Sequence, residues 1–304
     1  MAESLAVGFR VDASTLIGSG HVMRCLTLAD ALAEAGARCC FIMRQQQGSL
    51  EKAVSGRGHQ VLMLSSGGKE RSASHSENEP PHADWLVVGW EADASDTLQA
   101  MKGIELDWLV VDHYALERRW ESQVGVRAKR LMAIDDLADR KHQCDLLLDQ
   151  NLGREPHDYD GLVPGHAKRL IGSYYALLRP EFARARAMSL EARQTRETGN
   201  ILVSMGGVDA ANVTCNVLRV LDTIEVVSAY RVTVVLGAAC PHIDEVTEQA
   251  ESMRLATRVV VNANNMAELM SQADLAIGAA GGSAWERCCL GLPSLLVVMA
   301  DNQR

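Results

Sequence analysis

A glycine-bearing turn near the start of the sequence combines residue types suited to phosphate binding and proton transfer. Gly18, Gly20 and His21 separate a short apolar stretch, residues 5–9, from a run with helical spacing that contains Val22, Leu26, Ala29 and Leu32. Glycines let the backbone approach a ligand closely, and the free N–H groups of a helix N-terminus attract phosphate. An imidazole accepts a proton near neutral pH. The turn therefore predicts chemistry on a phosphorylated substrate with His21 as base, and a capping or packing role for His21 is the alternative.

Polar residues also stand at the ends of two predicted strands further along the chain. Asp112-His113-Tyr114 ends the apolar run that begins at residue 107, and Asp135-Asp136 ends the run that begins at residue 129. Ligands of parallel sheets bind outside the carboxyl ends of the strands, so these residues are candidates to line the site of His21. Capping of a following helix is the alternative role for the aspartates. Asp12 is a further candidate, either to orient His21 or for a structural role.

Two more glycine-rich turns lie in the C-terminal half of the chain. Gly206 and Gly207 follow the predicted strand 200–205, and Gly281-Gly282-Ser283 opens a helix that carries Glu286. Such a turn offers backbone N–H groups to a diphosphate. The two carboxylate oxygens of Glu286 could accept both hydroxyls of a ribose, although a solvated glutamate near a helix N-terminus needs no ligand to explain it.

The order of these segments predicts an α/β protein with two Rossmann-like parallel-sheet domains that face each other across a cleft. Strands alternate with helical segments throughout, which favours parallel sheets with right-handed crossovers. We place the domains at residues 1–180 and 181–304, with the boundary at a charged helix that begins at residue 181. The second domain is expected to be incomplete at its C-terminus. The segment 65–100 reads as an insert to which no function is assigned, and 85–88 within it as a minor strand or the edge of that insert.

Composition narrows the function classes. The 304 residues carry a net charge of −9, which argues against a general nucleic-acid or anionic-membrane binder. The eight cysteines form no C-x-x-C pair, which favours reduced, buried thiols. The sequence has no signal peptide and no apolar run long enough to span a bilayer. We expect a cytoplasmic protein, monomeric, without membrane or nucleic-acid partner, and with no metal or cofactor.

Taken together, these motifs resemble a known enzyme family. The C-terminal run Gly281-Gly282-Ser283-Ala284-Trp285-Glu286 is similar to the nucleotide-binding segment of glycosyltransferase-B proteins. The whole set resembles the UDP-2,4-diacetamido-2,4,6-trideoxy-β-L-altropyranose hydrolases of pseudaminic acid biosynthesis. That set consists of Arg10-x-Asp12, Gly18-x-Gly20-His21-x-x-Arg24, Asp112-His113-Tyr114, Asp135-Asp136, the run 144–151 and Met205-Gly206-Gly207-x-Asp209.

This resemblance implies hydrolysis of a UDP-sugar at the anomeric carbon with inversion, and with UDP-sugar as the ligand. It implies that His21 is the general base and that Tyr114 and Asn302 lie near the sugar and the attacking water, with Asp12 as a further candidate catalytic group. The residues expected to hold UDP or substrate are Gly18, Gly20, Arg24, Gly206, Gly207, Gly282, Ser283, Glu286 and Gln303. UDP is a good leaving group, so no dedicated acid and no metal is required.

Two alternatives remain at this level. A glycosyltransferase would share the fold and the UDP site and use an acceptor hydroxyl in place of water, because a fold alone does not settle the reaction. A catalytically silent UDP-sugar-binding module would bind nucleotide without turnover.

Overall fold

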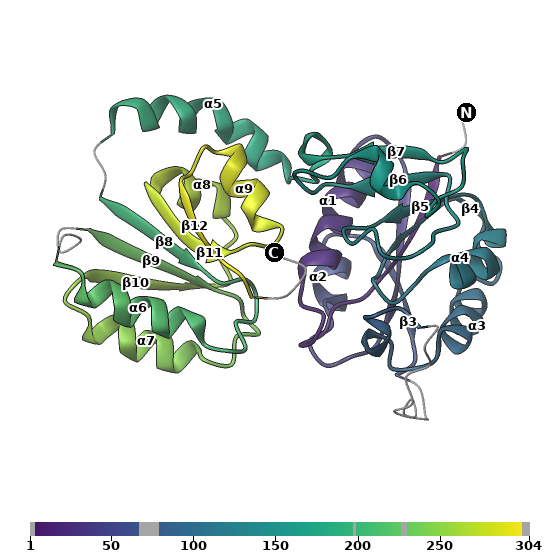
Figure 1. Ribbon diagram of the computed structural model, residues 1–304. Coiled ribbons are helices and arrows are strands. Elements are labelled where there is room, and N and C mark those ends of the chain that lie inside the picture. Colours follow the sequence, from purple (N-terminus) through teal and green to yellow (C-terminus); the bar gives the residue numbers. More distant parts are fainter. Residues whose placement is uncertain (1–3, 67–78, 197–198, 226–229, 300–304) are drawn as a thin grey trace. The chain divides into compact units, whose positions relative to one another are not determined.

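A computed structural model of the chain describes residues 4–66, 79–196, 199–225 and 230–299. The chain divides into two compact units, Met1–Leu177 and Leu178–Arg304. Each unit is built on one parallel β-sheet with helices on both faces, so the predicted α/β class with two parallel-sheet domains is confirmed (Figure 1). Two predicted site residues, Asn302 and Gln303, lie outside the described residues.

The first unit contains a seven-stranded sheet in the order β3-β2-β1-β4-β5-β6-β7. Neighbouring strands are parallel throughout, as the alternation of strands and helices predicts. Apolar side chains alternate between the faces: Phe9 and Val110 join one core, whereas Leu109 and Val111 join the other. The strands are β1 (Ala6–Val11), β2 (Arg38–Arg44), β3 (Gln60–Leu64), β4 (Leu106–Asp112), β5 (Ala128–Ile134), β6 (Leu146–Asp149) and β7 (Lys168–Ile171).

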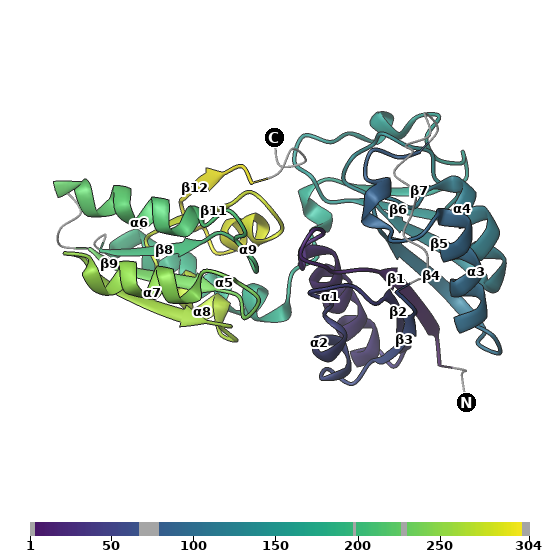
Figure 2. The same ribbon diagram turned by 90° about the horizontal axis from the view of Figure 1, so that it is seen from below.

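Helices cover both faces of this sheet, and Figure 2 shows the two layers on opposite sides of β1–β3. One layer holds α1 (Gly20–Glu34) and α2 (Glu51–Ser55), whose buried side chains pack with Phe9. The other holds α3 (Trp90–Ala100) and α4 (Arg118–Val124), which pack with Leu109. Short 3₁₀ helices lie in the connections, at η1 (Ala83–Trp85), η2 (Gly125–Arg127), η3 (Pro156–Tyr159) and η4 (Ser173–Tyr175).

The second unit contains a five-stranded parallel sheet in the order β10-β9-β8-β11-β12. The apolar positions of β8 alternate again: Ile201 and Val203 pack beneath α6 and α7, and Leu202 packs with α5 and α8 on the other face. The strands are β8 (Asn200–Ser204), β9 (Arg231–Leu236), β10 (Ala256–Val261), β11 (Leu275–Ala279) and β12 (Ser294–Val297). The helices are α5 (Pro180–Thr195), α6 (Val213–Thr223), α7 (Ile243–Ser252), α8 (Met266–Gln272) and α9 (Ser283–Cys289).

Each sheet has one point where the strand order reverses direction. In the first unit this point lies between the neighbours β1 and β4, and in the second between β8 and β11. Parallel sheets bind ligands in the crevice outside the strand ends at such a point. The glycine turns after β1, β8 and β11, together with Asp112 at the end of β4, all stand at these two positions.

Other features differ from the sequence prediction or qualify it. The segment 85–88, for which a minor strand or the edge of the insert was predicted, contains no strand: Trp85 ends η1, and residues 86–88 are irregular chain. All eight cysteines are free thiols, and Cys288 is exposed rather than buried. Within the described residues, no helix is both long and apolar enough to cross a bilayer.

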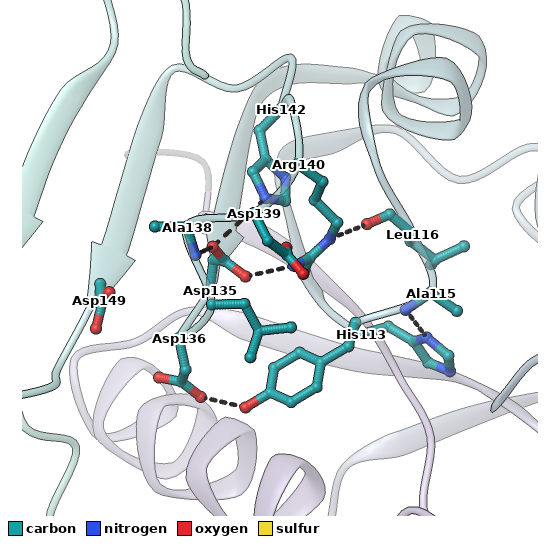
Figure 3. A network of polar contacts seen from close by, with 12 residues as sticks. His113, Ala115, Leu116, Asp135, Asp136, Ala138, Asp139, Arg140, His142 and Asp149 are labelled. Carbon is teal, nitrogen blue, oxygen red and sulfur yellow. Dashed lines mark hydrogen bonds and ion pairs between the residues drawn. The ribbon is translucent and has the colours of Figure 1, made fainter. Parts of the chain in front are cut away.

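Behind the carboxyl end of β5, a buried ion network fixes the loop that follows the strand (Figure 3). The Asp135 carboxylate contacts Arg140 Nη1 at 2.7 Å and accepts the Ala138 backbone N–H at 2.9 Å. His142 lies over the same carboxylate, with Nε2 3.8 Å from Asp135 Oδ2, and its Nδ1 is 2.7 Å from Oε1 of Glu121. Burial opposes the charged imidazolium, but the two carboxylates outweigh it and raise the pKa of His142 to about 9.

This raised pKa predicts a pH-dependent contribution of His142 to stability. A histidine whose pKa is higher in the folded than in the unfolded state stabilises the fold below the unfolded pKa, about 6.5, and loses that effect as pH rises through about 9. We therefore expect His142→Gln to lower the free energy of unfolding by about 3 kcal/mol at pH 6 and by little above pH 9. Urea denaturation of both proteins at several pH values measures the difference. A difference that stays constant from pH 6 to 10 would contradict the assignment.

Candidate active site and nucleotide-binding turns

The turn that carries His21 is held open by local hydrogen bonds. Gly18 adopts a φ of +80°, which favours glycine, and its N–H donates to Ser14 O at 2.8 Å. The Ser14 hydroxyl accepts the Ile17 N–H at 3.0 Å, so residues 14–18 form a closed loop in front of α1. His21 follows as the second residue of α1, and its ring reaches the end of β4, because Val11 of β1 is paired with Asp112 in the sheet.

His21, Asp112 and Arg24 form a tight, buried group. The His21 Nδ1 lies 2.6 Å from Asp112 Oδ1. Arg24 donates two hydrogen bonds to the same carboxylate, from Nε at 2.6 Å and from Nη2 at 2.7 Å. Asp112 is fully buried. Burial favours the protonated acid, but Arg24 and His21 outweigh it and hold the pKa of Asp112 well below its usual range. Asp112 is therefore a carboxylate at neutral pH.

The ionised state of Asp112 determines the tautomer of His21. A carboxylate only accepts hydrogen bonds, so the proton in the 2.6 Å contact belongs to His21 Nδ1. Arg24 Nη2 also lies 3.3 Å from Nδ1 and would need that atom as an acceptor. The contact with Asp112 is shorter and charge-assisted, so it prevails. Neutral His21 then has an unprotonated Nε2, the atom that a general base requires.

Aromatic rings surround this pair. The rings of Tyr114 and His21 pack edge-to-face, with their centroids 4.6 Å apart. The Tyr114 hydroxyl donates a hydrogen bond to Asp136 Oδ2 at 2.7 Å. Trp85 of η1 stacks on Tyr114 with a centroid distance of 5.0 Å, and it packs edge-to-face with His21 with a centroid distance of 5.6 Å. Trp85 is only half-buried, so it borders the two candidate catalytic side chains from the solvent side. The insert region therefore contributes directly to the site.

Of the two roles considered for Asp12, the contacts favour the structural one over the orientation of His21. Its carboxylate is buried away from His21 and pairs with Arg10 at 2.6 and 2.9 Å, while Oδ1 also accepts the Arg44 backbone N–H at 2.7 Å. His113 Nε2 lies 3.3 Å from Asp12 Oδ2. Asp12 thus neutralises buried charge beneath the sheet end, and Asp112 takes the place beside His21.

Arg24, predicted to bind the ligand, is paired with carboxylates in the structure. Besides Asp112, its Nη1 pairs with Asp136 Oδ2 at 2.5 Å, and only 11% of its side chain is exposed. Both carboxylates raise the pKa of Arg24, although burial opposes this. Arg24 is therefore a positioning group that connects Asp112 to the Asp136–Tyr114 pair.

In the second unit, the turn after β8 shapes the N-terminus of α6. Gly206 adopts a φ of +95°. Asp209, in the left-handed region at φ +43°, accepts the N–H groups of Val213 and Thr214 at 2.9 Å each. A Cβ at Gly237 would lie 2.1 Å from Gly207 O, so β9 approaches this turn at backbone contact. The predicted glycine turn is present, but the Asp209 carboxylate occupies N–H groups that a phosphate would use.

The turn after β11 leads into α9, where Glu286 has a defined partner. Glu286 Oε1 accepts Arg179 Nη2 at 2.9 Å, and Arg179 also pairs with Glu181 at 3.0 Å. Burial raises the pKa of Glu286, and Arg179 opposes that shift. The simpler expectation of a solvated glutamate does not hold, since only 18% of this side chain is exposed. Glu286 Oε2 accepts no hydrogen bond from the residues that the structure describes.

The sequence pattern did not reveal two residues of these sites, Trp85 and Arg179. Trp85 lies in a segment without clear periodicity, and Arg179 stands alone before Pro180, so neither carries a pattern. Asp136 was singled out only as part of an aspartate pair whose two members separate in the fold. Asp136 contacts Arg24 and Tyr114. Asp135 instead contacts Arg140 and His142 (Figure 3).

Three relatives match the chain in sequence. A protein of Methanocaldococcus jannaschii, Uncharacterized protein MJ1062, is 24% identical over 99% of the chain, which spans only 57% of that protein. The UDP-2,4-diacetamido-2,4,6-trideoxy-beta-L-altropyranose hydrolase of Campylobacter jejuni is 24% identical over 98% of the chain and 93% of its own length. The spore coat polysaccharide biosynthesis protein SpsG of Bacillus subtilis is 32% identical over 46% of the chain and 40% of its own length. The resemblance to the hydrolases is thus confirmed as a similarity in sequence. No family model matches.

Solved structures settle the fold. MurG of Acinetobacter baumannii superposes with a TM-score of 0.62 over 99% of this chain and 81% of MurG, at 13% identity. The glycotransferase of kitacinnamycin superposes with a TM-score of 0.62 over 100% of this chain and 82% of the glycotransferase chain, at 15% identity. The chain has the glycosyltransferase-B fold. At these identities the likeness concerns the fold alone.

The tautomer of His21 is directly measurable. We expect ¹⁵N NMR of the imidazole nitrogens at pH 8 to show Nδ1 protonated and Nε2 unprotonated, because Asp112 accepts from Nδ1. His59 provides an internal control, since its Nε2 contacts Asp30 Oδ1 at 2.8 Å and it should show the opposite tautomer. Signals are assigned by their loss in His21→Asn and His59→Asn. A His21 protonated at Nε2 would refute the assignment.

Proposed function

We propose that the protein hydrolyses a UDP-linked sugar at its anomeric carbon and releases UDP and the free sugar with inversion. The observation that carries this proposal is the His21–Asp112 contact at 2.6 Å, which leaves Nε2 of His21 free to act as base. Similarity over 98% of the chain to the Campylobacter enzyme supports the substrate class, a UDP-linked 2,4-diacetamido-2,4,6-trideoxy sugar.

In the proposed step, His21 Nε2 removes a proton from water as the water oxygen bonds to the anomeric carbon. The bond from that carbon to the β-phosphate oxygen breaks, and its electron pair leaves with UDP. Attack opposite the leaving group inverts the anomeric configuration. Buried Asp112 stabilises the imidazolium that forms, because a carboxylate in a low-dielectric site attracts that charge strongly. Tyr114, fixed by Asp136, borders the sugar in this proposal, and Trp85 offers it an apolar face.

Nucleotide binding is assigned to the second unit. Gly282 and Ser283 would present backbone N–H groups to the diphosphate, and Glu286 would accept ribose hydroxyls through Oε2, while Oε1 stays with Arg179. Gly206 and Gly207 remain candidates for the same ligand, as do Gly18 and Gly20 of the His21 turn. Asn302 and Gln303 keep their proposed roles at the active site and the nucleotide. A cytoplasmic, monomeric enzyme also remains a prediction.

A UDP-sugar-dependent glycosyltransferase is the second candidate. The superposition on the kitacinnamycin glycotransferase favours it, because that protein carries a transferase name. The chemistry at His21 would be unchanged, but an acceptor hydroxyl would take the place of water.

Release of UDP without an acceptor separates the two reactions. We expect the protein to liberate UDP from the UDP-linked diacetamido-trideoxy-altrose in buffer alone, and NMR taken during the reaction to show the inverted anomer of the free sugar first. The retained anomer appearing first would contradict direct attack by water. UDP release only after addition of an acceptor alcohol would instead support the transferase.

Substitution of His21 tests its role as base. We expect His21→Asn to reduce kcat by roughly 10²–10⁴-fold, since the proton acceptor is lost, while the affinity for UDP changes little. Steady-state kinetics and calorimetric titration with UDP measure the two quantities. His59→Asn is a matched control that removes a histidine contacting Asp30 and should leave kcat unchanged. Equal losses of UDP affinity and rate in His21→Asn would mean that His21 holds the phosphate instead.

A further inference from the structure

Arg287 organises the turn that follows β11. Its guanidinium is 1% exposed, and it donates from Nη2 to Ala279 O at 2.7 Å and from Nη1 to Ser283 Oγ at 3.1 Å. Ala279 is the last residue of β11 and Ser283 the first of α9. One cationic side chain therefore ties together both ends of the Gly281-Gly282 turn.

The position of Arg287 coincides with the reversal point of the second sheet. A Cβ on Gly278 would lie 2.8 Å from Arg287 Nη1 and 2.8 Å from Ser204 O, the carbonyl at the end of β8. The guanidinium thus lies where β8 and β11 end side by side, and only glycine at 278 leaves room for it. Parallel sheets bind ligands at this place.

Arg287 differs from Arg10 and Arg44, the other fully buried arginines, because Glu286 and Cys288 attract its charge without forming an ion pair with it. Arg10 pairs with Asp12 and Asp93, and Arg44 pairs with Asp93. Arg287 forms no ion pair with any residue that the structure describes, and its Nε has no hydrogen-bond partner there. The neighbouring Glu286 is paired with Arg179 instead.

A buried cation without an ion-pair partner costs folding free energy, and a ligand of opposite charge offsets that cost. Burial also lowers the pKa of Arg287, in keeping with a poorly solvated charge. An arginine remains protonated at neutral pH despite such a shift. The missing partner at this end of the sheet is therefore an anion.

We propose that Arg287 is a positioning residue for a nucleoside diphosphate: it fixes the Ala279–Ser283 turn and places beneath it the positive charge that the diphosphate neutralises. This inference rests on the proposed nucleotide site and adds to it a cation that lies behind the glycine turn. It predicts that the arginine destabilises the free protein and strengthens the binding of phosphorylated ligands only. A purely structural clamp would act on all ligands of the turn equally and would stabilise the free protein.

The test compares UDP with uridine, which shares the nucleoside and lacks the charge. We expect Arg287→Met to weaken UDP binding by about 10- to 100-fold in calorimetric titration and to change uridine binding less than twofold. Its melting temperature without ligand should equal or exceed that of the wild type, while the increase caused by UDP becomes smaller. Arg287→Lys should keep part of the UDP affinity, because it keeps the charge.

Arg193→Met is the matched control in the same unit. Arg193 also donates to backbone carbonyls, those of Leu290, Ala273 and Met270 at 2.6–2.9 Å, but not to the turn. This variant should lose melting temperature and keep the ratio of UDP to uridine affinity. The inference would be overturned if Arg287→Met weakened the binding of UDP and of uridine equally, or weakened neither.

Two further results keep the inference separate from the proposed function. If the wild type binds neither UDP nor inorganic pyrophosphate, the nucleotide site itself is refuted. If Arg287→Met fails to fold, Arg287→Lys and the salt dependence of wild-type binding decide the matter. An unaffected UDP affinity in Arg287→Lys, together with equal salt dependence for UDP and uridine, would then refute the role of Arg287.

Discussion

The ionised, fully buried carboxylate of Asp112 is the interaction on which the first site depends. A carboxylate at this depth persists because Arg24 meets it with two N–H groups and His21 with a third. The same contact selects the His21 tautomer and would stabilise an imidazolium. Arg24 then extends the network to Asp136 and, through it, to Tyr114. The buried Asp112 carboxylate thus determines both the position and the tautomer of His21.

Both sheets reverse their strand order once, but the buried arginines at the two reversal points differ in whether they form ion pairs. Each sheet reverses its strand order once, and each reversal point collects the functional groups of its unit. In the first unit the buried charges are matched: Arg10 with Asp12 and Asp93, and Arg24 with Asp112. In the second unit Arg287 lies buried without a carboxylate partner among the described residues, as proposed for a site completed by an anionic ligand.

Much of the fold follows from local sequence pattern. The apolar runs that became β1, β4, β5 and β8 were identified because buried parallel strands are short, continuous and bounded by turn residues. The edge strand β7 and the helix α4 were missed, since half-exposed edge residues and a short charged helix lack a strong period. The segment 85–88, considered as a minor strand or the edge of the insert, forms no strand, and Trp85 at the end of η1 packs on Tyr114. Local propensity cannot encode this contact, because the two residues are 29 positions apart.

The sequence by itself determined the fold class, the glycine turns at the strand ends and the candidacy of His21, because periodicity and turn chemistry are local properties. Only the tertiary structure decided which carboxylate pairs with which basic side chain. Asp12 and Asp112 both end a strand beside the same turn, yet the pleat directs Asp12 to Arg10 and Asp112 to His21. It also separated Asp135 from Asp136 and placed no carboxylate of the described part of the chain in an ion pair with Arg287. Charge pairing in a folded chain depends on distances of a few ångströms between segments far apart in sequence, and no local pattern contains that information.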